Sequence, residues 1–270
     1  MSKIHHAIHE IHRLDQLAER DQWANRLHPL VKLFVTITFI AVSVSFSRYD
    51  VIGLAVMAVY LWFGFQLSEL SFRECLWRVR VILPLVCMVG VPNLFLDRLP
   101  VQIGPLTVYT GVLSMLTLMM KGIFAVLASY LLIATTGIEQ ICYALRRLHV
   151  PSVMVTQILL TYRYITLLLE QVRIVTQAYS MRAPYQKGVH YKVWGSLAGQ
   201  LLLRSIDRAN EVYESMSLRG YTGDFLYIRE KVSFQLRDLL YLLIWTAFFA
   251  AARSMPLILV IGNLVTRLFS

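Results

Sequence analysis

Two arginines close two similar stretches in the middle of the chain. Arg182 lies in QAYSMRAPY, and Arg219 lies in YESMSLRGY. Each follows a long helix-like run and precedes a helix breaker, Pro184 or Gly220. A guanidinium in the last turn of a helix can donate to unpaired carbonyls, which stabilises the helix by about 0.3–1 kcal/mol. Because two matched ends occur, we favour a docking device with two contact points over simple capping.

Histidines at the N-terminus form a second group with possible chemistry. His5, His9 and His12 would share one face of a helix, with His6 beside them, and such spacing can hold a transition metal. No cysteine or well-placed carboxylate completes the set, so we favour a polar surface helix. The three cysteines, Cys75, Cys87 and Cys142, are isolated and indicate neither a disulfide framework nor a zinc site. We expect no metal site and no cofactor.

Composition indicates a membrane protein whose apolar helices must position these residues. Apolar residues make up 57% of the chain and charged residues 16%, whereas a soluble domain carries about 25% charged residues. Mean hydropathy is +0.58. A membrane span needs about 20 residues. The predicted fold is an all-α integral membrane protein with about five transmembrane helices, and the tail 255–269 is expected to form a surface or half-span segment. The apolar runs are 30–47, 51–66, 81–96, 110–136 and 236–252.

The net charge of +10 suits a membrane protein better than a nucleic-acid binder, because the basic residues lie beside the apolar runs. Loops rich in lysine and arginine stay cytoplasmic. We therefore place the N-terminus and the middle region on the cytoplasmic side of a cell membrane and the C-terminus on the outer side. Arg253 and Arg267 oppose the assignment of the C-terminus. The basic segment 67–80 is expected to be a cytoplasmic interfacial helix and 97–105 an external turn. The N-terminal segment lacks an apolar signal-peptide core, so we expect no cleavable signal.

Two lysines lie in or beside the apolar runs. Lys32 follows His28 and Pro29 at the start of the first run, where proline is tolerated and the lysine is close enough to the membrane edge to anchor there. Lys121 lies well inside the fourth run, and an intramembrane charge normally faces protein or water. We expect Lys121 to point into the helix bundle or towards a partner. No acidic residue in a span is available to form an ion relay with it.

The middle region predicts long amphipathic helices. Residues 137–150 have an apolar stripe, Ser152 is a candidate N-cap, and two helices follow over 152–182 and 189–219. At 1.5 Å per residue each long helix extends about 45 Å. They are too polar to span the bilayer and too apolar for a solvated hairpin, so we expect them to connect the membrane to a cytosolic protein. The predicted domains are a four-span block (1–136), a coupling-helix region (137–233) and a final span with its tail (234–270).

These features resemble the transmembrane coupling (T) component of energy-coupling-factor transporters, most closely the CbiQ type of cobalt and nickel uptake systems. The resemblance covers nearly the whole chain, including the HPLVK entry to the first run at 28–32. The two arginine endings match the family's paired Ala-Arg-Xaa motifs, with Met181 and Leu218 where alanine is usual.

The resemblance implies partners and roles. Arg182 and Arg219 would each enter a groove on one of two cytosolic ABC ATPases, and the docking set is Met181, Arg182, Ala183, Leu218, Arg219 and Gly220. A guanidinium suits this role because its planar fork pairs bidentately with a carboxylate. The coupling helices would pass ATP-driven motion to a membrane-embedded substrate-binding (S) component in a bacterial or archaeal membrane. The candidate contacts with that component are Lys121, Leu159, Tyr162, Trp194 and Leu201.

Three other functions are open at this point. A vitamin importer of the same type differs only in its substrate, which another subunit would select. A membrane-embedded enzyme needs converging titratable or metal-binding groups, and a P-loop needs G-x-x-x-x-G-K-[ST]; the sequence has neither. A secondary transporter usually has repeated halves, which are not evident here. We therefore predict a coupling subunit without enzymatic activity, with ATP hydrolysis on its partners.

Overall fold

The computed structural model of the chain divides into two compact units. The long-helix unit comprises residues 1–17 and 137–231, and the bundle unit comprises residues 18–136 and 232–270. The structure describes residues 11, 13, 15–18, 22–48, 50–69, 84, 87–88, 90–92, 100–103, 106–183, 188–223 and 234–254. The histidine cluster, most of the predicted interfacial helix and the tail 255–269 lie outside the described residues, as does most of the run 81–96.

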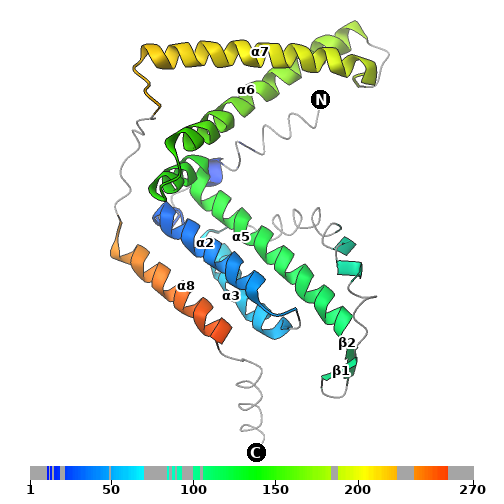
Figure 1. Ribbon diagram of the computed structural model, residues 1–270, viewed down its shortest axis with the longest axis vertical. Coiled ribbons are helices and arrows are strands. Elements are labelled where there is room, and N and C mark those ends of the chain that lie inside the picture. The colour runs from blue at the N-terminus through cyan, green and yellow to red at the C-terminus, as the bar shows by residue number, and fades with distance from the viewer. Residues whose placement is uncertain are drawn as a thin grey trace, which may run out of the picture. The chain divides into compact units, whose positions relative to one another are not determined.

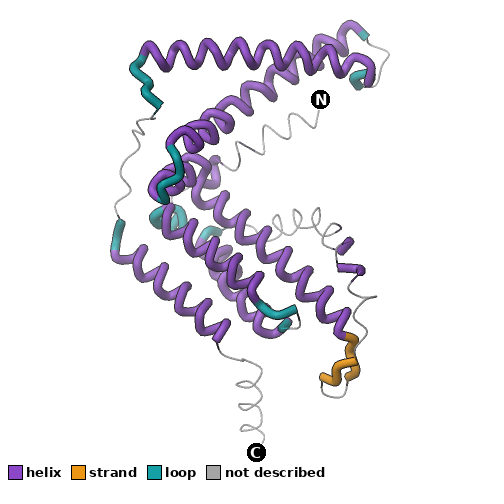
Figure 2. Tube along the Cα trace, viewed as in Figure 1, coloured by secondary structure: helices purple, strands orange, loops and turns teal. Residues whose placement is uncertain are grey.

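Helices dominate the described part of the chain (Figure 2), which confirms the predicted all-α class. One exception is a two-stranded antiparallel hairpin, in which Pro100 pairs with Tyr109. The sequence analysis predicted only a turn here, but β-branched and apolar residues flank Gly104 and Pro105, which is a hairpin pattern. The elements in Figure 1 are α2 (Pro29–Ser45), α3 (Val51–Leu67), β1 (Pro100–Ile103), β2 (Leu106–Tyr109), α5 (Thr110–Arg147), α6 (Ser152–Arg182), α7 (Tyr191–Leu218) and α8 (Leu236–Ser254).

An aromatic cluster forms the core of the bundle unit. Phe39 of α2 lies 4.7 Å from Tyr60 of α3 and 5.6 Å from Phe249 of α8, measured between ring centroids. Trp245 of α8 packs edge-on against Tyr60 at 4.8 Å. Phe124 of α5 joins the same cluster. Such rings each bury a large apolar area and have preferred contact geometries, so they fix the packing of the helices.

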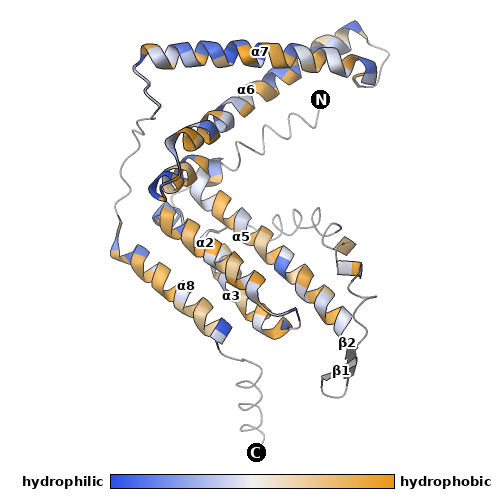
Figure 3. Ribbon diagram, viewed as in Figure 1, coloured by the Kyte–Doolittle hydropathy of each residue, from blue (hydrophilic) through white to orange (hydrophobic). Residues whose placement is uncertain are grey.

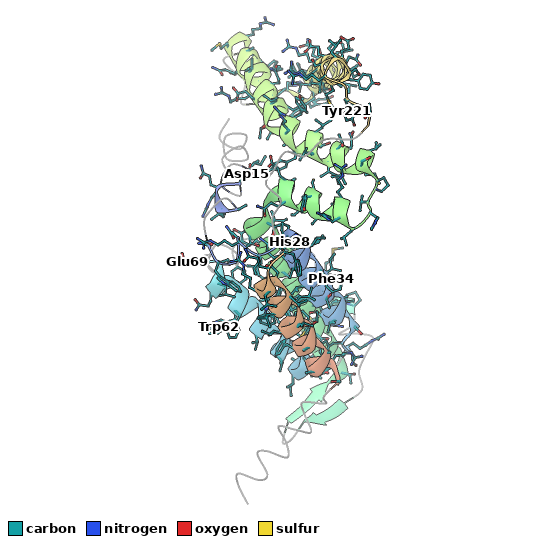
Figure 4. All side chains as sticks on the ribbon, turned by 90° about the vertical axis from the view of Figure 1, so that its left-hand side faces the viewer. Asp15, His28, Phe34, Trp62, Glu69 and Tyr221 are labelled. Carbon is teal, nitrogen blue, oxygen red and sulfur yellow. The ribbon has the colours of Figure 1, made fainter. Side chains whose placement is uncertain are left out.

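The outer surface of the bundle unit is apolar as well. Phe34 of α2 and Trp62 of α3, labelled in Figure 4, are more than half exposed. Apolar colour covers most of α2, α3, α5 and α8, whereas α6 and α7 mix both colours along their length (Figure 3). Among the described residues, α5 and α6 are long and apolar enough to cross a bilayer by length and composition. Apolar faces both inside and outside a bundle are typical of a protein in lipid.

Helix α5 changes direction at Gly137, where the two units meet in the sequence. Gly137 has φ 54° and ψ 153°, a non-helical conformation that glycine adopts without a Cβ clash. The next helix, α6, begins after Pro151, which occupies the N-cap position without a side-chain hydrogen bond. The predicted N-cap, Ser152, is instead the first helical residue, so that prediction was wrong by one position.

Lys32 satisfies the backbone just before this break. Its ammonium is buried, with the residue 6% exposed, and donates to the carbonyl of Thr135 at 2.7 Å. A non-helical residue interrupts the regular hydrogen bonds of a helix, so carbonyls before it need other donors. The sequence analysis placed Lys32 at the membrane edge as an anchor. The structure corrects this, because Lys32 turns inward to the backbone of α5.

We expect Lys32→Met to destabilise the bundle unit by about 1–3 kcal/mol, because it leaves a buried carbonyl without a donor. Thermal unfolding of the purified chain in mild detergent, followed by tryptophan fluorescence, measures the effect. Lys192→Met is the control, since Lys192 is exposed at the start of α7. An unfolding temperature as high for Lys32→Met as for Lys192→Met would show that the Lys32 hydrogen bond contributes nothing.

Candidate functional site

The end of α7 is capped entirely by backbone groups around Arg219. The amide of Gly220 donates to the carbonyl of Ser217, and the amide of Tyr221 donates to that of Met216, both at 3.0 Å. Gly220 has φ 82°, so these bonds form a Schellman motif with glycine in the left-handed conformation. Tyr221, labelled in Figure 4, follows directly after this turn. The carbonyls of Met216 and Ser217 therefore have donors without help from the Arg219 side chain.

The end of α6 resembles the end of α7, because its arginine side chain is also exposed. Arg182 is the last residue of α6, and the amide of Ala183 donates to the carbonyl of Tyr179 at 3.0 Å. Among the residues that the structure describes, neither Arg182 nor Arg219 makes a side-chain hydrogen bond or ion pair. Both side chains are exposed, Met181 is 72% exposed and Leu218 is 89% exposed. The simpler interpretation of the sequence was that the arginine side chains cap their own helices. Neither arginine does so in the part of the chain that the structure describes.

Helices α6 and α7 leave most of their apolar side chains uncovered. Within the described part of the chain, α7 has no buried residue, and α6 buries only Val155 and Thr156. Trp194 is 60% exposed. The two helices therefore do not bury their apolar faces against each other. The large exposed apolar residues of these helices include Ile158, Leu167, Leu168, Ile174, Leu202, Leu203, Ile206 and Tyr213.

Polar contacts along the two helices fix their charged faces. Arg173 forms an ion pair with Glu170 on α6, and Arg208 forms one with Glu211 on α7. Both pairs have the three-residue spacing that places side chains on one helix face. Arg204 does not pair with an acidic residue of α7 and instead donates to the side-chain oxygen of Gln171 at 3.3 Å.

The predicted contacts with a membrane subunit are divided between the two units. Lys121 is in the bundle unit, where its ammonium donates to the carbonyls of Val44 and Phe46 at 2.9 and 2.6 Å. It caps the end of α2, a favourable position for a cation at the negative end of a helix. The remaining candidates are in the long-helix unit: Leu159, Tyr162, Trp194 and Leu201.

Tyr162 makes a contact that the sequence did not indicate. Its hydroxyl donates to the Asp15 carboxylate at 2.5 Å, which joins the N-terminal segment to α6 within the long-helix unit. The Asp15 segment is labelled in Figure 4. Trp194 is exposed, while Leu159 and Leu201 are half-buried. Of this set, Trp194 therefore offers the largest free apolar surface.

Asp238 is a buried polar residue that the sequence analysis missed. It is 1% exposed and accepts hydrogen bonds from the backbone amides of His28 at 3.0 Å and Gln235 at 2.9 Å. It thereby joins the start of α2 to the start of α8, and His28 is labelled beside these helices in Figure 4. A carboxylate three residues into a helix that bonds back to the N-cap amide is half of a capping box. The three-residue spacing from Gln235 to Asp238 was the signal in the sequence that could have identified this contact.

The described residues offer little room for a ligand inside the bundle unit. A cavity of about 30 Å³ lies beside Lys32, Thr36 and Tyr60, which is space for a water molecule or two. No group of three or more histidine, cysteine or acidic residues that could hold a metal ion occurs within the described ranges. This cavity is too small for a substrate or an organic cofactor.

The capping geometry predicts how the end of α7 responds to substitution. Arg219→Ala should change local stability by less than about 0.5 kcal/mol, because the side chain has no partner here. Gly220→Val should cost about 1–2 kcal/mol, because a β-branched residue is strained at positive φ. Hydrogen–deuterium exchange of the last turns of α7 measures both. Equal acceleration of exchange in the two variants would show that the guanidinium caps the helix.

Known proteins resemble this chain over most of its length. The family model described as CbiQ, cobalt transport protein, matches residues 20–233. The chain is 24% identical to the cobalt transport protein CbiQ of Salmonella typhimurium over 224 residues, which cover 78% of this chain and 98% of that protein. It is 26% identical over 214 residues to the energy-coupling factor transporter transmembrane protein EcfT of Thermosediminibacter oceani, covering 74% of this chain and 80% of that protein.

An uncharacterized protein of Methanocaldococcus jannaschii is 27% identical over 189 residues, covering 66% of this chain and 64% of that protein. The Salmonella relative is named a cobalt transport protein, and the Thermosediminibacter relative is named a transporter transmembrane protein. The family match extends across both units, from the segment before α2 to the segment after α7. The chain therefore belongs to the CbiQ family of cobalt transport proteins.

Proposed function

We propose that this chain is the transmembrane coupling subunit of an energy-coupling-factor ABC importer. It would transmit the ATP-driven motion of two cytosolic ATPases to a membrane-embedded substrate-binding subunit. The observation that carries this proposal is the pair of exposed arginines, Arg182 and Arg219, at helix ends whose last turns are closed by backbone amides. Charged groups that the chain itself does not use are available to partners.

Each arginine would dock on one ATPase. A guanidinium keeps its charge and presents a rigid fork of donors, so it can pair both oxygens of a partner carboxylate. The exposed Met181 and Leu218 precede the two arginines and would add apolar contact around each ion pair. Ala183 and Gly220 follow them and leave space for close approach of the partner backbone.

The apolar faces of α6 and α7 would contact the substrate-binding subunit. Trp194 is the leading contact because it is exposed on the first turn of α7, and Leu159 and Leu201 would support it. Lys121 and Tyr162 are weaker candidates, since both side chains have partners within the chain. We assign a multi-pass topology with the N-terminus and the long helices in the cytoplasm, on the charge distribution of the loops.

Cobalt is the substrate that the comparisons favour. The Salmonella relative is named a cobalt transport protein, and the matching family model has the same description. The EcfT relative has no substrate in its name. The chemistry that selects a metal or a vitamin would reside in the partner that binds it, so nickel and vitamins are the alternatives to cobalt.

We expect Arg182→Ala and Arg219→Ala each to reduce recovery of co-expressed ATPases with the chain by about tenfold or more. Truncating one partner of a desolvated charge pair costs about 2–5 kcal/mol, and 1.4 kcal/mol corresponds to tenfold. Purification from membranes in mild detergent measures recovery, and ATP-dependent cobalt uptake measures coupling. The chain without its partners should neither hydrolyse ATP nor accumulate cobalt.

Arg204→Ala is the matched control, because Arg204 is an exposed arginine of α7 that lies away from the helix end. All variants should insert into membranes at the level of the parent chain. Full uptake and normal ATPase recovery in the double variant of Arg182 and Arg219 would contradict the docking role.

A further inference from the structure

A hollow of about 260 Å³ lies between α6 and α7 and includes Arg219 in its lining. Both helices belong to the long-helix unit (Figure 1). Arg163 comes from α6, whereas Arg208 and Glu211 come from α7. The apolar part of the lining is Leu160, Val212 and Met216. A docking arginine at a helix end thus shares one concave surface with an arginine from the middle of the other long helix.

The charges in this hollow do not balance. Glu211 pairs with Arg208 at 2.9 Å. The guanidinium groups of Arg163 and Arg219 have no hydrogen bond or ion pair within the described part of the chain. Two positive charges therefore face a hollow that has no carboxylate left for them. Near a protein surface the effective dielectric constant is about 20, so these charges attract an anion more strongly than they would in bulk water.

We propose that this hollow receives an acidic side chain, with apolar neighbours, from the ATPase that docks at Arg219. The proposal rests on the proposed function and adds Arg163 as a further docking residue. The guanidinium forks of Arg163 and Arg219 provide donors for the two oxygens of one carboxylate, while the apolar lining takes the neighbouring side chains.

The size of the hollow favours a protein side chain over a small organic ligand. Pockets for small organic ligands have volumes of about 300–1,000 Å³, and this hollow is smaller than that range. Its lining also continues to the exposed end of α7, where Leu218 is uncovered. A partner surface that contacts Arg219 would therefore meet the hollow as part of the same interface.

The test is recovery of co-expressed ATPases with the full chain, as above. Arg163→Gln should reduce recovery by about tenfold or more. Arg204→Gln should leave it unchanged, because Arg204 is exposed but does not line the hollow. Both positions are on the surface, and membrane insertion and thermal unfolding should match the parent chain in both variants.

Glu211→Gln should change ATPase recovery in the opposite direction to Arg163→Gln. Glu211 is the only acidic residue in the described lining of the hollow, and it competes with an incoming carboxylate for the arginines. Its neutralisation should therefore increase ATPase recovery or slow dissociation of the complex. A loss of recovery as large as that of Arg163→Gln would overturn the proposal that the guest is acidic.

The variants also separate this inference from the proposed function. If Arg163→Gln matches Arg204→Gln while Arg182→Ala and Arg219→Ala lose the ATPases, the helix ends dock alone and the inference fails. If Arg163→Gln and Arg219→Ala lose them while Arg182→Ala keeps them, the hollow is the docking site and the two-ended proposal fails. If Arg163→Gln keeps the ATPases but loses binding to phosphatidylglycerol vesicles, relative to phosphatidylcholine vesicles, the guest is a lipid phosphate and the inference is overturned.

Discussion

The bundle unit depends on charged side chains that satisfy backbone groups at helix ends and breaks. Lys32 donates to the Thr135 carbonyl before the break in α5, and Lys121 donates to carbonyls at the end of α2. Asp238 accepts from the amides of His28 and Gln235, where α2 and α8 begin. A bilayer core has no water to satisfy such groups, so the protein must supply the partners itself. These charges are therefore structural, and a substrate or proton could not use them without loosening a helix.

The long-helix unit distributes its charges differently. The last carbonyls of α7 are met by the amides of Gly220 and Tyr221, so the guanidinium of Arg219 is not needed for the fold. Arg182 and Arg163 likewise make no side-chain bond within the described residues. An exposed residue that makes no bond within the fold and carries a full charge is available to a partner. Lys32 differs, because its ammonium is buried and bound to the backbone of α5.

The sequence predicted the long elements well and the tertiary contacts poorly. The bounds of α6 agree with the predicted helix 152–182, because a long periodic segment carries a strong signal. The inward turn of Lys32 could not be predicted, since it depends on a carbonyl of a distant helix. The capping-box spacing of Asp238 to Gln235 is local and was overlooked, whereas its hydrogen bond with His28 depends on a distant helix. The arginine endings were visible as motifs, but the hollow was not, because Arg163 and Arg219 meet only through the packing of α6 against α7.

Exposed apolar surface has different meanings in the two units. On α2 and α3 it is nearly continuous, as at Phe34 and Trp62, and lipid alone can cover it. On α6 and α7 the exposed apolar residues alternate with arginines. In the bilayer core, Arg163 would have no partner for its charge. In water, the apolar surface of Trp194 would stay uncovered. Length and apolar content would allow α6 to span a membrane, but its charges argue against that location. A surface that is both apolar and acidic would satisfy both requirements, and the proposed ATPase partner would have to provide one.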